Sequence, residues 1–571
     1  NRYYPHKNTG SHMIGYLGKI SEDFEDKEYV ENKKYNKDDI VGKTGVEESF
    51  EETLKGSNGR RIVYTNVMGQ TTDVLEERPS VGGKKLYLGM DLDLQKATEE
   101  ALERTIKAIA SGNNYSSKYG DLPMTRFPNA SSGASVIMDV KTGQILALAS
   151  YPDFDPNLFV NGISNSDWKS LRQGDEADIY APRPLFNIAS QSAIAPGSTF
   201  KTVTSLAALK NGLDPNTQVT CNGVMHIGDS NFGCWIYNRN GGNHGPLNLY
   251  DALGVSCNFY FYSLGLGENP TSNDQLDTLV TVDDIEQMAG LLKLNQATGI
   301  EINIPYESQG YVPNYVSKVN IVKIMLRNYL KENLVKYKIG DEFKTNEQIG
   351  QDIEEVVSWV DKGPEMDRQE VLAELKKLGY EGEYPLEGEI TSLSDMVKYT
   401  YLNQATWTKS DSLNMVIGQG QNAYTPMQIV QLASIIANEG VLNKPSLVKE
   451  IRSYDNNKLV FENEGKSEKL DINKDDFKVV KEGMRRSSAF YAIRNTFPIE
   501  TASKTGTAET GGTNPVTGED YDNFAWEMLF APYDNPEIAV VSVVIQGGES
   551  ANLLGLNTDL VHYYIAASPP Y

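Results

Sequence analysis

"FAWEMLFAPYDNPEIAVVSVVIQ", residues 524–546, consists of two apolar runs separated by the polar turn "YDNP". Short apolar runs rich in β-branched residues and bounded by turn residues predict strands, so this segment predicts a β-hairpin. Residues 133–140 ("GASVIMDV") and 143–150 ("GQILALAS") repeat the pattern around a short polar turn. Two hairpins so far apart in the chain predict one antiparallel sheet that is closed by both ends of a domain.

Helical patterns surround these hairpins. Residues 91–110 have apolar residues at helical spacing and acidic residues near the start, which predicts a helix. Residues 195–212, "APGSTFKTVTSLAALKNG", predict a helix that begins after Pro-Gly and ends near Gly212. Residues 60–67 predict a short strand, and the charge-rich stretch at about 309–405 predicts a helical insertion. The fold class expected is α+β, with helices flanking the antiparallel sheet.

Composition limits the classes of function. The chain has 571 residues, enough for two or three domains, and its formal charge of −24 argues against a nucleic-acid partner. Three cysteines exclude a disulfide-stapled scaffold. No run approaches the roughly 20 apolar residues of a membrane-spanning helix. Because the chain opens at Asn1 without a Met or a signal peptide, we expect a trimmed piece that has lost any anchor or export signal.

Ser198 and Lys201 form the first motif with chemical meaning. They are three positions apart on the predicted helix, so both side chains lie on one face. A serine hydroxyl is a poor nucleophile until a base takes its proton, and a lysine with a lowered pKa can be that base. The helix N-terminus disfavours an ammonium group and offers N–H groups to an oxyanion. Ser-x-x-Lys alone, however, occurs by chance in most chains of this length.

Two further motifs follow along the chain. Ser256 and Asn258 are two positions apart, so on an extended or loop segment both side chains point the same way. The serine can then relay a proton while the asparagine holds an amide. Lys504-Thr505-Gly506 lies next to the C-terminal hairpin, and its glycine lets a substrate backbone approach an edge strand. Its lysine, together with the hydroxyls of Thr505 and Thr507, is expected to bind a carboxylate.

Lys-Thr-Gly occurs three times, and the copies differ in their surroundings and in their order relative to the other two motifs. Lys43-Thr44-Gly45 lies among charged loop residues, and Lys141-Thr142-Gly143 is the turn of the first hairpin. Only the copy at 504–506 follows the other two motifs in the order Ser-x-x-Lys, Ser-x-Asn, Lys-Thr-Gly. The first two copies are therefore interpreted as turns.

In this order the motifs resemble those of penicillin-binding proteins and serine β-lactamases. The surrounding segments are similar to a penicillin-binding transpeptidase, as in "PLFNIASQSAIAPGSTFK" (184–201) and "NMVIGQGQNAYTPMQIVQLASIIAN" (414–438). Residues 2–18 and 42–59 resemble the non-catalytic pedestal of class B, monofunctional members. The resemblance covers almost the whole chain except roughly 309–405. It implies a β-rich pedestal domain at 1–115 and a penicillin-binding/serine β-lactamase-like transpeptidase domain at 116–571.

The resemblance also implies a role for each motif residue. Ser198 would attack the penultimate D-Ala carbonyl of a peptidoglycan stem peptide while neutral Lys201 takes its proton. The oxyanion would be held by backbone N–H groups of Ser198 and Thr507. Ser256 would pass a proton to the departing D-Ala, and Asn258 would orient the donor peptide. The terminal carboxylate of the stem peptide, or the carboxylate of a β-lactam, would be bound by Lys504, Thr505, Gly506 and Thr507.

The family further implies a setting in cell-wall synthesis and cell shape. We expect β-lactam antibiotics to acylate the enzyme, and no cofactor to be needed for acyl transfer. A membrane anchor would hold the catalytic domain on the extracytoplasmic face of the bacterial cell membrane, where a polytopic glycan polymerase is an expected partner. A D,D-carboxypeptidase shares the mechanism. A β-lactamase usually lacks the pedestal, and a β-lactam sensor usually carries membrane helices and a protease.

The stretch before Ser256 raises the question of a metal. Its pattern C-x₄-H-x₂-D-x₄-C-x₉-H contains five potential ligands: Cys221, His226, Asp229, Cys234 and His244. Thiolates, a carboxylate and imidazoles suit tetrahedral zinc. The set favoured here is Cys221, Asp229, Cys234 and His244, with His226 as the substitute fourth ligand. Such a site would be structural and would hold the loop before Ser256.

Two alternatives to zinc stay open for the cysteines. In the related proteins a Cys pair is common at this place, and an extracytoplasmic location permits a Cys221–Cys234 disulfide. The cysteines are free thiols in the second alternative. Cys257, which belongs to Ser-Cys-Asn, is expected to be a packed thiol in either case.

Overall fold

The computed structural model describes residues 2–20, 25–33, 35–172, 174–340 and 344–567. Its central element is a five-stranded antiparallel sheet in the order β20-β21-β22-β8-β9. The strands are β8 (Ser132–Asp139), β9 (Ile145–Tyr151), β20 (Ala502–Ala508), β21 (Phe524–Ala531) and β22 (Ile538–Ile545). The two predicted hairpins are β8–β9 and β21–β22, and they join through the β22–β8 pair. The prediction of one antiparallel sheet is confirmed.

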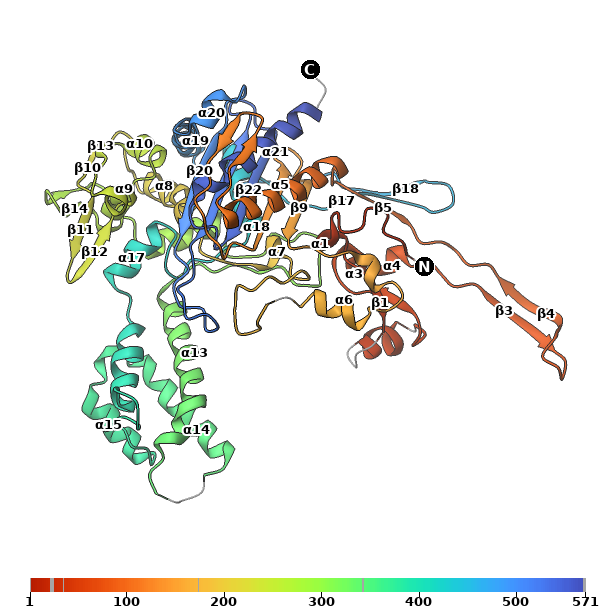
Figure 1. Cartoon of the computed structure of the whole chain (residues 1–571), viewed down its shortest axis with the longest axis horizontal. Coiled ribbons are helices and arrows are strands. Elements are labelled where there is room, and N and C mark those ends of the chain that lie inside the picture. Colours follow the sequence, from red (N-terminus) through yellow and green to blue (C-terminus); the bar gives the residue numbers. More distant parts are fainter. Residues whose placement is uncertain (1, 21–24, 34, 173, 341–343, 568–571) are drawn as a thin grey trace. The chain divides into compact units, whose positions relative to one another are not determined.

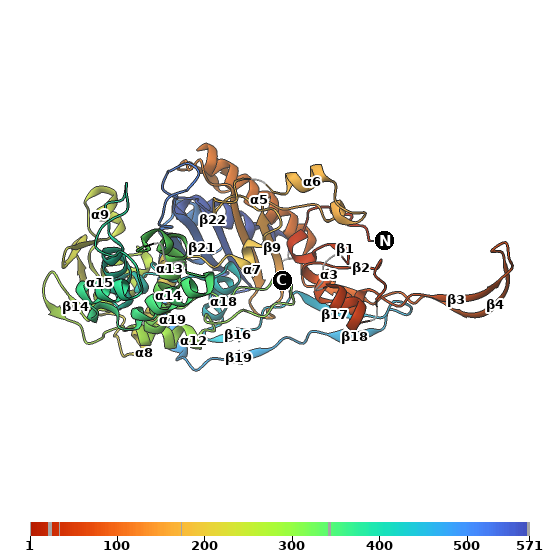
Figure 2. The ribbon, with the colours of Figure 1, turned by 90° about the horizontal axis from the view of Figure 1, so that it is seen from below.

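Helices cover both faces of this sheet (Figures 1 and 2). The predicted helix at 91–110 is α5 (Leu92–Ser111), which packs with α21 (Leu554–Ala567) against one face. Leu102, Leu529 and Val540 belong to the core formed there. Helix α18 (Pro426–Ala437) packs against the opposite face. Among the described residues, none of these helices or any other has the length and apolar character needed to cross a bilayer.

A group of helices lies beside β20 at the edge of the sheet. It begins with the 3₁₀ helix η3 (Gly197–Phe200), which leads into α8 (Lys201–Lys210). The others are α10 (Leu249–Gly254), α11 (Asn258–Leu266) and α19 (Lys474–Ala489). Small antiparallel pairs connect α8 to α10: β10 (Val219–Cys221) with β13 (Gly245–Leu247), and β11 (Val224–Ile227) with β12 (Ser230–Gly233). This group carries the first two sequence motifs.

The N-terminal part contains short strands and helices. They are α1 (Ser11–Ile14), β1 (Leu17–Lys19), β2 (Ile40–Gly42), α3 (Gly45–Ser49), β3 (Arg60–Thr65), β4 (Thr71–Arg78) and β5 (Lys85–Leu88). Strand β5 pairs with β17 (Val448–Arg452), which also pairs with β18 (Leu459–Glu462). His12 is buried, and its Nε2 lies 2.7 Å from the Pro184 carbonyl oxygen. The segment at 2–18, which resembles the pedestal, therefore packs against the rest of the first compact unit. The domain boundary at residue 115 stays a prediction.

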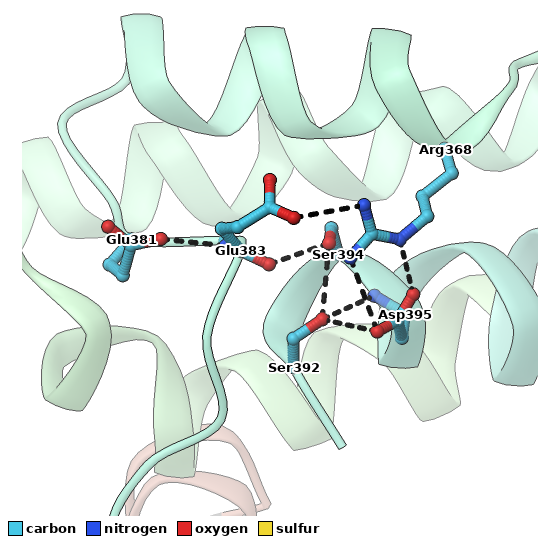
Figure 3. Close-up of polar contacts among 7 residues, drawn as sticks. Arg368, Glu381, Glu383, Ser392, Ser394 and Asp395 are labelled. Atoms are coloured by element: carbon cyan, nitrogen blue, oxygen red, sulfur yellow. Dashed lines mark hydrogen bonds and ion pairs between the residues drawn. The ribbon is translucent and has the colours of Figure 1, made fainter.

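A second compact unit comprises Thr281–Glu286 and Pro313–Met415. Its main helices are α13 (Tyr315–Asn333), α14 (Asn346–Ser358) and α15 (Arg368–Lys377), and they enclose a hydrophobic core of their own. Figure 3 shows how its polar groups connect these elements. Arg368 at the start of α15 donates to Asp395 at 2.5 Å and to Glu383 at 3.5 Å. Asp395 also accepts from the Ser392 hydroxyl at 2.6 Å, so one arginine fastens two chain segments to α15.

Candidate active site

The turn that carries Ser198 lies directly against the edge strand β20. Two glycines make this approach possible. A Cβ on Gly506 would lie 2.6 Å from the Pro196 carbonyl oxygen, and a Cβ on Gly197 would lie 2.6 Å from the Thr507 carbonyl oxygen. Gly197 also has a φ of +55°, in the left-handed region that favours glycine. Half-buried Ser198 is therefore held beside the Lys-Thr-Gly strand.

Lys201, the first residue of α8, is fully buried and points to the Ser-Cys-Asn segment. Its Nζ donates to the Asn258 Oδ1 at 2.6 Å, to the Ser256 carbonyl at 2.9 Å and to the Ser256 hydroxyl at 3.3 Å. Burial lowers the pKa of this lysine to about 8, and the nearby sulfurs of Cys234 and Cys257 oppose that shift. A substantial neutral fraction near neutral pH suits a lysine to the removal of a proton.

The Ser256 hydroxyl is the point where all three motifs meet. It accepts a hydrogen bond from Lys504 Nζ at 2.8 Å as well as the one from Lys201. Lys504 is also fully buried, and both this burial and the positive charge of Lys201 hold its pKa well below the usual range. Residues that are 303 positions apart in the chain, Lys201 and Lys504, thus share one serine hydroxyl.

Of the two settings considered for Ser-Cys-Asn, extended or loop, the structure shows a turn that leads into a helix. Ser256 has a φ of +55°, Cys257 caps a helix, and Asn258 is the first residue of α11. The two side chains still point the same way, since both contact Lys201. The left-handed turn at Ser256, rather than strand alternation, brings them together.

Strand β20 is the outermost strand of its sheet, and no strand of the described residues pairs with its outer edge. The Thr505 carbonyl accepts from Lys504 Nζ at 2.9 Å, and the Thr507 carbonyl accepts from Gln419 Nε2 at 3.3 Å. These carbonyls therefore point away from β21. In an extended strand the N–H and C=O of one residue point to the same side, so the Thr507 N–H also faces the open edge. Sequence reasoning missed Gln419, although this residue lies within residues 414–438, which resemble a penicillin-binding transpeptidase.

A second residue that sequence reasoning missed is Tyr491. Its hydroxyl lies 3.1 Å from the Thr505 hydroxyl, and most of its side chain is buried. Tyr491 thereby fixes the direction of a hydroxyl group in the third motif. A lone tyrosine between α19 and β20 has no spacing pattern that could have revealed this contact.

The cysteines form a cluster next to the Ser256 segment. Cys221, Cys234, His244 and Cys257 each offer one ligand atom, and these four atoms lie within 4.8 Å of one another. His244 Nδ1 is 3.5 Å from Cys234 Sγ and 3.8 Å from Cys221 Sγ, and the sulfurs of Cys234 and Cys257 are 3.9 Å apart. All three cysteines are buried and unbridged. The cluster can hold a metal ion.

The predicted ligand Asp229 is not in this cluster, and neither is its substitute His226. Both are exposed on the β11–β12 hairpin, where His226 Nδ1 lies 2.5 Å from Asn231 Oδ1. Cys257, which we expected to be only a packed thiol, takes the fourth position. The hairpin projects the intervening residues away from the two cysteines that flank it, whereas the chain returns at Cys257 after α10.

The two other copies of Lys-Thr-Gly lie outside the site. Lys43 follows β2 and forms an ion pair with Glu25. Lys141 and Thr142 form the β8–β9 turn, where their N–H groups donate to Asp139 Oδ1 at 2.8 and 2.9 Å. Both contacts are those of turns and loops.

Comparison with known families gives two matches. The family described as "Penicillin binding protein transpeptidase domain" matches residues 133–351 and 356–558. The family described as "Penicillin-binding Protein dimerisation domain" matches residues 1–88. Together they account for the N-terminal segments and for the sheet with its three motifs.

Individual relatives agree with these matches. "Peptidoglycan D,D-transpeptidase MrdA" of Acinetobacter baumannii is 32% identical over 59% of this chain and 43% of its own length. MrdA of Haemophilus influenzae is 26% identical over 99% of this chain and 69% of its own length. A chain in a solved structure of a peptidoglycan synthase complex that coordinates polymerization and crosslinking is 26% identical, with a TM-score of 0.66. That match covers 100% of this chain and 77% of the other.

Proposed function

The chain belongs to the class B penicillin-binding protein transpeptidases, and on that premise we propose that it cross-links peptidoglycan through an acyl-enzyme formed at Ser198. The observation that carries the proposal is the Ser256 hydroxyl, which accepts hydrogen bonds from both Lys201 and Lys504. The two hydrogen bonds bring together Lys201 as the base, Ser256 as the proton relay and the strand of Lys504 as the carboxylate-binding element.

The geometry supports a defined sequence of steps. Neutral Lys201 takes the proton as Ser198 Oγ attacks the penultimate D-Ala carbonyl of a stem peptide. The N–H groups of Ser198 and Thr507 stabilise the oxyanion. The proton then passes through the Ser256 hydroxyl to the nitrogen of the departing D-Ala. An amine of a neighbouring strand attacks the acyl-enzyme, so the serine ester breaks and a new amide forms, while the proton lost by the amine nitrogen returns to Ser198 Oγ.

Binding of the donor peptide is assigned to the edge of the sheet. Lys504 Nζ and the hydroxyls of Thr505 and Thr507 bind the terminal carboxylate of a stem peptide, or the carboxylate of a β-lactam. Asn258 has its Oδ1 on Lys201 and its Nδ2 3.4 Å from the Gly233 carbonyl. It holds the lysine in place and presents its amide to the donor peptide.

Labelling with a fluorescent penicillin tests the nucleophile and the motif together. Ser198→Ala is expected to abolish covalent labelling, and Lys504→Ala to reduce it strongly. Lys141→Ala is the matched control, because it changes the same tripeptide motif in a turn outside the site. Labelling that survives Ser198→Ala, or equal losses for Lys504→Ala and Lys141→Ala, would refute the assignment.

The fate of the acyl-enzyme separates transpeptidase from its alternatives. With a stem-peptide donor and an added D-amino acid, a transpeptidase yields the exchanged peptide, whereas a D,D-carboxypeptidase yields the shortened one. Rapid turnover of nitrocefin would instead indicate a β-lactamase. We expect the exchanged or cross-linked product and no sustained nitrocefin hydrolysis.

We also propose that Cys221, Cys234, His244 and Cys257 hold a zinc ion. Tetrahedral zinc, with bonds of about 2.3 Å to sulfur and about 2.0–2.1 Å to nitrogen, sets its ligand atoms roughly 3.5–3.8 Å apart. Three of the six distances among the four ligand atoms, 3.5, 3.8 and 3.9 Å, are near these values, and all six are within 4.8 Å. A closed set of four protein ligands is typical of a structural site. Measured zinc near one per chain, lost in Cys234→Ala but kept in Asp229→Ala, is the expected result.

The biological setting follows from the chemistry of the substrate. Peptidoglycan lies outside the cytoplasmic membrane, so we assign the catalytic unit to the extracytoplasmic face of a bacterial membrane. The synthase complex described above supports a glycan polymerase as partner. Addition of such a polymerase and its substrate is expected to raise the rate of cross-linking by this chain, and an unchanged rate would contradict the partnership.

A further inference from the structure

A cavity of about 400 Å³ is lined by residues from three parts of the first compact unit. They come from helix α18, from the two-stranded sheet of β16 (Val441–Asn443) and β19 (Ser467–Lys469), and from residues 293–298. None of these residues belongs to the three motifs or to the cysteine cluster. The wall at 294–296 is fixed to α18 by Gln428, whose Nε2 donates to the carbonyls of Leu294 and Gln296, both at 2.9 Å.

Three lysines, Lys293, Lys444 and Lys466, surround this cavity. Lys444 follows β16 and Lys466 precedes β19, and the Lys444 N–H donates to the Lys466 carbonyl at 2.8 Å. The two lysines are therefore cross-strand neighbours, an arrangement in which like charges repel. Lys293 forms an ion pair with Glu468 at 2.9 Å, whereas the described residues provide no ion pair for Lys444 or Lys466. The cavity thus keeps an excess of two positive charges in a chain with a net charge of −24.

An unpartnered amide lies in the same cavity. Gln431, one turn after Gln428 on α18, is 2% exposed and lines the cavity. Its Nε2 has no hydrogen-bond partner among the described residues. A buried donor without an acceptor costs free energy, and an acceptor placed in the cavity would remove that cost. Leu442 contributes an apolar wall beside these polar groups.

We propose that this cavity is a binding site for a phosphoryl group, either of free phosphate or of a small organic phosphate. A phosphoryl dianion matches the excess of two positive charges, and lysine ammonium groups bind phosphate as point charges. Its oxygens accept from Lys444, Lys466 and the Gln431 amide at once. The cavity volume of about 400 Å³ is more than ten times the roughly 30 Å³ that one water molecule occupies in the liquid. It therefore exceeds the volume of a phosphate ion, and the cavity also accommodates a small organic group.

Calorimetric titration of the whole chain at low salt tests the site with inorganic phosphate and glycerol 3-phosphate as probes. Saturable binding of one ion per chain is expected. Tighter binding of glycerol 3-phosphate identifies an organic phosphate as the ligand type, and equal affinities identify free phosphate. The Lys444→Gln, Lys466→Gln double variant is expected to bind at least about tenfold more weakly, because it loses two charge-assisted contacts. Lys458→Gln, which changes an exposed lysine outside the cavity, is expected to bind as the parent chain does.

Gln431→Leu separates ligand binding from a structural role. It removes a buried donor without a partner, so without phosphate its melting temperature should equal or exceed that of the parent chain. Its affinity for phosphate should nevertheless fall. Absence of saturable binding, equal affinity in the double variant and the parent chain, or a heat signal reproduced by sodium chloride at matched ionic strength would overturn the proposal.

Discussion

The pH dependence of acylation is the sharpest consequence of the site geometry, because it follows from the buried state of one lysine. Burial lowers the pKa of Lys201 from 10.5 to about 8. At pH 7 this raises the neutral fraction about 300-fold, to roughly a tenth of the molecules. If neutral Lys201 is the base, the second-order rate constant for acylation by penicillin rises about tenfold per pH unit below 8 and levels off above it.

Asn258→Asp moves this profile in a defined direction. The amide oxygen at 2.6 Å from Lys201 Nζ becomes a carboxylate oxygen, which favours the ammonium form. An opposite charge at this range raises a lysine pKa by roughly 1–3 units. Acylation at pH 7 should therefore fall by about 10- to 1000-fold and recover as the pH approaches 10.

Stopped-flow measurements with a fluorescent penicillin between pH 6 and 10 distinguish this effect from simple damage to the site. Asn258→Ser is the matched control, because it removes the amide but adds no charge. Its rate should fall at every pH while the midpoint stays at or below about 8. A parent profile that is flat between pH 6 and 8, or equal midpoints for Asn258→Asp and Asn258→Ser, would refute Lys201 as the base.

Three further predictions concern packing and buried charge. Gly506→Ala places a Cβ 2.6 Å from a carbonyl oxygen and should reduce acylation on the order of 100-fold while the chain stays folded. Gly350→Ala is the control and should leave acylation unchanged, because its Cβ would meet no atom of the described residues within 4 Å. Burial raises the pKa of Glu99 to about 7, so the folded state holds the proton of this carboxyl more tightly than the unfolded state does. The free energy of unfolding should therefore fall by up to about 3 kcal/mol as the pH rises from 4.5 to 7. Glu99→Gln should remove this pH dependence in unfolding measurements across that range. Glu527→Gln removes the negative charge that lies 2.7 Å from the buried Arg494 guanidinium and should cost about 3–5 kcal/mol of unfolding free energy in denaturant titrations.

The sheet could be predicted from the sequence because its evidence is local. The strands β8, β9, β21 and β22 are mainly apolar runs with turn residues between the two strands of each pair, and this pattern indicates both hairpins. Helix α5 begins one residue later than predicted and ends at Ser111, followed by the left-handed Gly112. These features depend on neighbours within a few positions, which a sequence displays directly.

The contacts of the site depend on the path of the chain between the motifs, which the sequence does not display. Asp229 is close in sequence to Cys234, yet the β11–β12 hairpin carries it into solvent. Cys257 is more distant in sequence and reaches the cluster through the turn after α10, where the Cys257 N–H donates to the Ala252 carbonyl. Gln419 contacts Thr507 across 88 positions through a single side chain, and no periodicity marks such a residue.

The position of Cys257 between Ser256 and Asn258 connects the cysteine cluster to the segment to which we assign the proton relay. A non-glycine residue in the left-handed region, as at Ser256, costs of order 1–3 kcal/mol and persists only where its surroundings hold it. Lys201 holds this segment from one side through the Ser256 carbonyl and the Asn258 amide oxygen. The cluster holds it from the other side through the buried sulfur of Cys257. In the proposed mechanism Ser256 relays a proton, which requires it to stay within hydrogen-bonding distance of both lysines. On that proposal, loosening either attachment should lower the rate of acyl transfer before it lowers the affinity for substrate.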